Sequence, residues 1–226
     1  MKKDILSNPK VKMIIFLVTV FLLFLSAEIV RVTKPLFDKV YYGYLTPMIL
    51  DVLRMIIYFT IFFVSSNYAK KNFDKIESTP FKEISTKRVL VLYALTFLII
   101  FVVTAILNFR LKVVVDLGEN VGAIYLYNNI AKIGAGIVRM LLSFLIIRYV
   151  DVIFKDVLKE KIFKYVPVGG IASMLTIGLF ELLITPKILF IDVLFMLMHI
   201  IYGYIYRLAY CNRGVTILIM IFIRLL

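Results

Sequence analysis

Four ionisable side chains interrupt the apolar stretches in the second half of the chain: Arg139, Glu181, Asp192 and His199. The carboxylate of Glu181 and the imidazole of His199, the only histidine, can both accept a proton, so the two residues could support general-base chemistry. A charged side chain at the centre of a bilayer costs about 2.5–3.5 kcal/mol, so such residues usually face protein and have a partner or a task. The sequence therefore predicts one polar intramembrane cluster built from these four residues.

Arg139 sits near the middle of an apolar segment, 129–150, with no acidic residue within one helical turn. It needs an acid from another helix, and we expect Glu181 first and Asp192 second, with Asp51 also available. Two interpretations are open: a buried ion pair that holds helices together, or an arginine that faces a ligand or substrate. The small residues at 134–136 precede it by one turn and would let another backbone come close.

Asp192, Phe195 and His199 are spaced at i, i+3 and i+7, which places them on one face of a helix. If that face packs against the helix that carries Glu181, the four residues of the predicted cluster come together inside the bundle. The histidine could be a hydrogen-bonding residue in helix packing or a catalytic residue. Two further charge pairs, Glu28 with Arg31 and Asp51 with Arg54, have i, i+3 spacing, so we expect local pairing on one helix face.

The composition is that of a polytopic membrane protein. Of the 226 residues 62% are hydrophobic and 18% are charged, whereas a soluble domain is close to half apolar. The mean hydropathy is +0.99. The formal charge of +13 is carried by residues between the apolar runs, which indicates loop lysines facing anionic lipid and not a nucleic-acid partner.

The sequence predicts no metal and no cofactor. A single cysteine excludes an intramolecular disulfide framework and a cysteine-based metal cluster. One histidine without a pair of acids at ligand spacing argues against other metal sites, and no Walker A, GxGxxG or HExxH motif occurs.

Apolar segments predict an all-α bundle of six to seven transmembrane spans that forms a single integral membrane domain over 1–226. About 20 residues are needed to cross the hydrocarbon layer, and the last segment is shorter than that. The segments are 13–30, 47–66, 89–109, 129–150, 166–185, 188–206 and 215–226.

Loop charge predicts the orientation. Basic residues concentrate before the first segment, in 69–88 and in 148–164, which places the N-terminus and these loops in the cytoplasm. The stretch 151–165 carries apolar residues on one helical face and lysines on the other, as expected of a helix lying in the membrane interface. Abundant Ile, Lys, Phe and Tyr without Trp suits an AT-rich bacterial genome, so we expect a bacterial cell membrane.

The C-terminal third resembles the membrane CAAX-protease and bacteriocin-processing (CPBP, or Abi) family, whose motifs are Glu-Glu-x-x-x-Arg, Phe-x-x-x-His and a final His-x-x-x-Asn. Residues 178–185, GLFELLIT, are similar to the first motif, and 195–199, FMLMH, match the second. The stretch 203–206, GYIY, is similar to the region before the last helix. The resemblance implies the family's helical membrane fold, with Glu181 activating water and His199 supporting the oxyanion.

The chain departs from that pattern at several catalytic positions. Phe180 stands in place of the first glutamate, Thr185 in place of the arginine, and no histidine or asparagine follows Gly214. Loss of one oxyanion donor alone lowers kcat about 10²–10³-fold. The departures favour a protein that has kept the fold and lost the activity.

Three functions are compatible with these residues. The first is a non-catalytic accessory or regulatory protein that binds a membrane or cell-envelope protein or peptide. The second is an intramembrane glutamate-type peptidase that uses Glu181 and His199. The third is a small-solute transporter subunit with the same buried charges as its binding site, although no two-half symmetry with broken helices appears.

Overall fold

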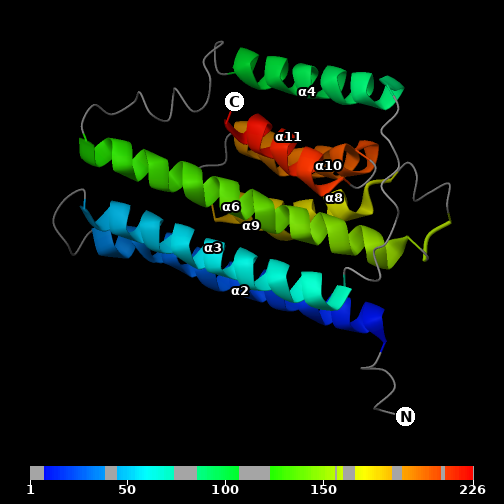
Figure 1. Cartoon of the computed structure of the whole chain (residues 1–226). Helices are drawn as coiled ribbons and strands as arrows, with labels where there is room; N and C mark the ends of the chain where they lie inside the picture. The colour runs from blue at the N-terminus through cyan, green and yellow to red at the C-terminus, as the bar shows by residue number, and fades with distance from the viewer. Residues whose placement is uncertain are drawn as a thin grey trace.

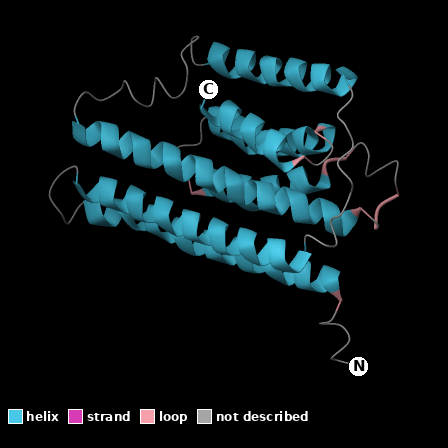
Figure 2. Ribbon diagram, viewed as in Figure 1, coloured by secondary structure: helices cyan, strands magenta, loops and turns pink. Residues whose placement is uncertain are grey.

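A computed structural model of the chain describes residues 8–38, 45–73, 86–106, 123–155, 157–159, 166–184, 190–209 and 212–225. Every regular element in these ranges is helical, so the predicted all-α class is confirmed (Figure 2). Each predicted apolar segment overlaps a described helical stretch. The elements are α2 (Pro9–Asp38), α3 (Leu45–Phe73), α4 (Thr86–Ile106), α6 (Ala123–Phe154), α8 (Val168–Ser173), the π-helix η1 (Met174–Gly178), α9 (Leu179–Leu183), α10 (Phe190–Leu208) and α11 (Arg213–Leu225).

Local sequence sets two of the helix starts. Asn8 precedes α2 and its side-chain oxygen accepts a hydrogen bond from the backbone N–H of Lys10 at 2.9 Å, while Pro9 takes the first helical position. Asn212 does the same for α11, accepting from the N–H of Val215 at 3.2 Å. Both helices therefore begin where a capping side chain satisfies a free backbone donor.

Helix α6 is the centre of the bundle. Figure 1 shows it between the α2–α3 pair on one side and α10 and α11 on the other, with α4 outermost. Every residue from 142 to 150 is buried. Leu142 belongs to a core shared with α2 and α3, and Phe144 to a second core shared with α10 and α11. An apolar helix that is covered on both sides is buried all round, which explains the absence of a polar stripe over these turns.

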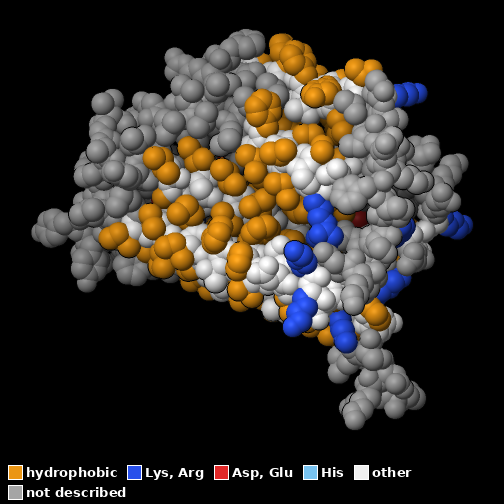
Figure 3. All heavy atoms as spheres, in the orientation of Figure 1, with side chains coloured by type: hydrophobic (Ala, Val, Ile, Leu, Met, Phe, Trp, Pro, Cys, Tyr) orange, Lys and Arg blue, Asp and Glu red, His pale blue; other side chains and the backbone are white. Residues whose placement is uncertain are grey.

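Basic side chains gather at one end of the bundle. The start of α2 and the ends of α3 and α6 lie together there (Figure 1). In Figure 3 the lysine and arginine side chains of the visible face cluster at this end, and the rest of its described surface is largely apolar. The exposed lysines of these helix ends are Lys12, Lys70, Lys71 and Lys155.

Large apolar side chains cover the outer surface of the described helices. Leu22 is 58% exposed, Phe97 70% and Leu218 69%. Among the residues that the structure describes, two helical segments are long and apolar enough to cross a membrane, judged by length and composition: Pro9–Ile29 and Ile49–Phe73. Soluble monomers rarely expose apolar patches of this extent, so the surface is suited to lipid or to another protein.

The segment 151–165, for which the sequence predicts an interfacial helix, is described only in part. Residues 151–154 are the last turn of α6, and Lys155 and residues 157–159 form a turn and a bend. Asp151 is buried because it is bonded to another helix end, as described below. The remaining residues, 160–165, lie outside the described part of the chain.

Candidate functional site

Arg139 and Glu181 form an ion pair between α6 and α9, through Nη1 and Oε1. This confirms the first-choice partner predicted from the sequence. At about 1.5 Å per residue, Arg139 lies about 22 Å along α6 from Phe154, and Glu181 about 20 Å from Val168. The two helix ends lie at the same end of the bundle, so the depths match and the side chains meet. The side chain of Arg139 is 7% exposed and that of Glu181 34%.

Further charges surround Arg139. Asp51 and Arg54 on α3 are joined at 3.2 Å, as their spacing predicted. Glu28 on α2 is fully buried, and its carboxylate and that of Asp51 both attract Arg139. The predicted pairing of Glu28 with Arg31 lies outside the described side chains. With Glu181, three carboxylates among the described side chains therefore attract Arg139.

His199 is anchored by a serine that the sequence did not single out. Its Nδ1 lies 2.9 Å from Oγ of Ser173 on α8, and both side chains are buried. The ring of Tyr202 packs edge-on against the imidazole, with 5.9 Å between centroids. A serine inside an apolar stretch carries no distinctive sequence pattern, so only the helix crossing reveals this contact.

Glycines allow α8 to approach two helices closely. A Cβ on Gly169 would overlap the backbone of Ile147 on α6. A Cβ on Gly203 of α10 would lie 2.7 Å from Cα of Gly170. A Cβ on Gly178 would lie 3.0 Å from Cδ2 of His199. Small residues at these positions therefore bring α8 and α10 together at the depth of the Ser173–His199 contact.

The predicted close approach at 134–136 is also present. A Cβ on Gly134 would lie 2.5 Å from Sδ of Met55, which belongs to α3. Arg139 follows on the same helix, and its guanidinium carbon lies 5.9 Å from the ring centroid of Tyr58 on α3. The close packing of α3 against α6 thus places Arg139 beside the charged side chains of α3.

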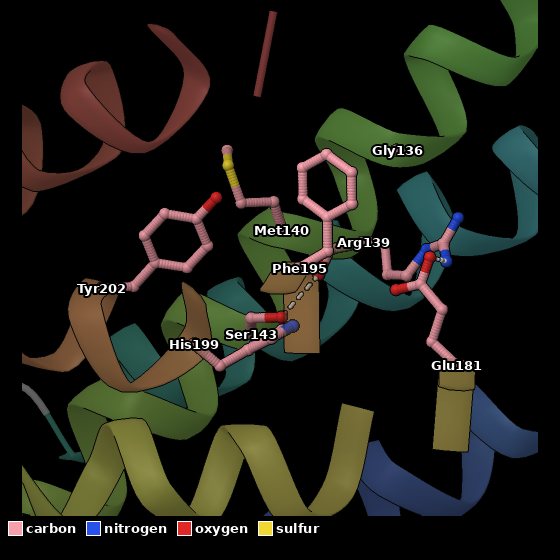
Figure 4. A pocket seen from close by; sticks show the side chains of 8 residues that line it. All are labelled: Gly136, Arg139, Met140, Ser143, Glu181, Phe195, His199 and Tyr202. Atoms are coloured by element: carbon pink, nitrogen blue, oxygen red, sulfur yellow. Dashed lines mark hydrogen bonds and ion pairs between the residues drawn. The ribbon is translucent and has the colours of Figure 1, made fainter. Parts of the chain in front are cut away.

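A cavity of about 40 Å³ lies between α6, α9 and α10. Three of the four predicted cluster residues line it, but Asp192, in the first turn of α10, does not. A site of this size holds two or three water molecules, and drug-sized ligands need roughly 300 Å³ or more. Its lining consists of Gly136, Arg139, Met140, Ser143, Glu181, Phe195, His199 and Tyr202 (Figure 4).

Glu181 and His199 lie on different sides of this cavity. In Figure 4 the Glu181 carboxylate turns toward Arg139, and the imidazole lies away from that pair, near Ser143. The hydroxyl of Ser143 donates to the carbonyl of Arg139 at 3.2 Å. The arrangement can hold water between an ion pair and a histidine. It does not direct the carboxylate at the imidazole.

A second polar contact, missed from the sequence, joins three helices at the basic end. Arg207 of α10 donates from Nε and Nη2 to the two carboxylate oxygens of Asp151, each at 2.7 Å. Asp151 also accepts from the backbone N–H of Gly169 at 2.8 Å, and Arg207 donates to the carbonyl of Val166. Two parallel hydrogen bonds fix both the distance and the relative orientation of the guanidinium and carboxylate groups. The contact therefore constrains the packing of α6, α8 and α10 at this end of the bundle.

No protein-family model, curated protein or solved structure matches the chain.

Proposed function

We propose that this chain is a multi-pass protein of a bacterial cell membrane, with a cytoplasmic N-terminus. We propose that it acts as a non-catalytic accessory or regulatory protein that binds a membrane or cell-envelope protein. The observation that carries the proposal is the engagement of Glu181 by Arg139. The carboxylate that a glutamate-type peptidase would use on water is held in an ion pair between two helices.

Membrane insertion is supported by the exposed apolar side chains and by the two helical segments of spanning length. The orientation is supported by the gathering of lysines at one end of the bundle, since basic residues favour the cytoplasmic side. The helix ends at this basic end are those whose loops the sequence assigned to the cytoplasm.

Loss of catalysis is supported by the packing of the residues that replace the family's catalytic positions. Phe180, which stands where the CPBP pattern has its first glutamate, packs its ring against Phe24 with 6.0 Å between centroids. It is partly buried, packs against the α2–α3–α6 core and adds no proton donor to the cavity. Thr185, the counterpart of the family's arginine, lies outside the described residues. We propose that the chain is a degenerate CPBP-like protein in which this region serves packing.

The peptidase alternative keeps one observation in its favour, because Glu181 and His199 line the same cavity. Water in that cavity would reach both groups. Against it, a volume of about 40 Å³ leaves no room for a peptide segment in this state. The two proposals therefore differ in whether the side chains themselves are needed for biological activity.

Two near-isosteric variants separate these proposals. Glu181→Gln and His199→Asn should leave the cellular phenotype intact and should co-purify with the same protein partner in mild detergent from the native host. Ser173→Ala is the matched control, because it removes the hydrogen bond to His199 without changing the imidazole. If Glu181→Gln and His199→Asn accumulate normally yet behave like a deletion while Ser173→Ala does not, and an unprocessed peptide builds up, the peptidase is correct.

A further inference from the structure

A triangle of aromatic rings joins α2, α3 and α6 at the basic end of the bundle. The ring centroid of Phe16 on α2 lies 5.5 Å from that of Phe73 on α3 and 5.7 Å from that of Tyr149 on α6. The centroids of Phe73 and Tyr149 are 5.7 Å apart, and all three residues are buried. Because large buried rings contribute strongly to packing, the triangle fixes how the ends of these helices lie relative to one another.

Exposed lysines flank this triangle on all three helices. Lys12 precedes the α2 ring by one turn, and Lys155 follows the α6 ring by six residues. Lys70 and Lys71 precede the α3 ring by three and two residues. Among the described side chains at this end, the carboxylate is that of Asp151, and both of its oxygens are already bonded to an arginine of α10. The packed rings therefore hold several positive charges in one region, which favours an anion from outside the chain.

An exposed apolar face of α3 leads to these lysines. Ile56, Phe59 and Phe63 are each more than half exposed, and the rings of Phe59 and Phe63 stack with 6.3 Å between centroids. Lys70 follows Phe63 by seven residues, or two turns, so the lysine and the aromatic pair share one face of the helix. The rise of about 1.5 Å per residue places the charge about 10 Å beyond the ring of Phe63. In Figure 3 the basic side chains adjoin the apolar surface of the visible face.

We infer that Lys12, Lys70 and Lys71 bind the headgroup of an anionic phospholipid, with its acyl chains along the apolar face of α3. This inference rests on the proposed insertion in a bacterial membrane. The charge of the site complements a phosphate group, and lysine stems can follow apolar surface while the ammonium groups stay at the headgroup level. The adjoining apolar face favours a lipid over a soluble anion, because only a lipid joins a negative headgroup to apolar chains.

Lipid retention by the purified full chain tests the inference. The chain in mild detergent is incubated with equal amounts of phosphatidylglycerol, which is anionic, and phosphatidylcholine, which is zwitterionic, both with the same acyl chains. Native mass spectrometry then counts the lipids that each chain keeps. The test variant is Lys12→Gln/Lys70→Gln/Lys71→Gln, and the corresponding arginine triple variant keeps the charge. Lys87→Gln is the matched control, because this exposed lysine belongs to α4, the outermost helix, which packs on α10 and α11 (Figure 1).

We expect the wild-type chain to keep phosphatidylglycerol at least about tenfold over phosphatidylcholine in about 0.1 M salt, and to lose most of that preference in about 1 M salt. Each lysine near an anionic headgroup is worth about fivefold in binding, so the glutamine triple variant should bind both lipids alike. The arginine triple variant and Lys87→Gln should bind as the wild type does. If the glutamine triple variant does not accumulate, Lys71→Gln alone should lower the preference about fivefold.

Two results would overturn the inference alone: a wild-type chain that stays in carbonate-washed membranes but shows no preference, and a loss in Lys87→Gln as large as in the lysine site. The second result would mean that net charge, and not the arrangement of these lysines, attracts the lipid. Recovery of the wild-type chain in the carbonate-soluble fraction would instead overturn the proposed membrane insertion, and this inference with it.

Discussion

Removal of the charge of Arg139 should destabilise the bundle far more than removal of the charge of Glu181. The reason is the balance of charges around the pair. In Glu181→Gln, Arg139 keeps the attraction of Glu28 and Asp51. Arg139→Gln removes the guanidinium group that attracts Glu181, Glu28 and Asp51 together.

The expected magnitudes follow from burial. Arg139 is almost fully buried, and removal of one partner of a buried pair typically costs about 3–5 kcal/mol. Glu181 is one-third exposed, so its Coulombic contribution is partly screened by solvent. The glutamine can still accept one hydrogen bond from Arg139, and such bonds average about 0.6 kcal/mol in membranes. We expect a loss of about 1 kcal/mol or less for Glu181→Gln.

The measurement is thermal unfolding of the detergent-solubilised protein for both single variants and the double variant. The double variant removes one positive and one negative charge and so restores the wild-type net charge; its loss of stability should therefore be smaller than the sum of the two single losses. Equal destabilisation by the two single variants would refute the charge-balance reasoning. So would strict additivity in the double variant, since it would mean that Arg139 and Glu181 are not coupled.

The helix crossings give two further predictions. Gly203→Val should abolish accumulation in the membrane, since its Cβ would overlap the α8 backbone. Gly214→Ala should be neutral, because a Cβ there meets no atom closer than 3.7 Å. Quantitative immunoblotting of the membrane fraction checks both variants. Arg207→Lys should lose the two-point contact with Asp151 and lower the unfolding temperature, although the charge is kept. Wild-type stability for Arg207→Lys would show that the geometry of the contact is not needed.

The sequence alone determined the helical class, the positions of the helices and the partner of Arg139. Hydrophobic runs fix helices because their periodicity and length are local properties. The pairing of Arg139 with Glu181 was predictable because few acids occur at a suitable depth and an unpaired central arginine is costly. The i, i+3 pair Asp51–Arg54 was predictable for the same local reason.

Tertiary structure alone decided the rest. The Ser173–His199 contact and the Asp151–Arg207 contact join residues 26 and 56 positions apart, and helix crossing sets their distances. The helices can cross this closely because glycines such as Gly169 and Gly203 have no Cβ that would overlap the backbone of the neighbouring helix. The exclusion of Asp192 from the cavity lining has the same origin: helical spacing gave it a face shared with His199, but two helical turns separate them in depth. Periodicity gives the direction of a side chain around its helix, and only packing gives its depth against a neighbour.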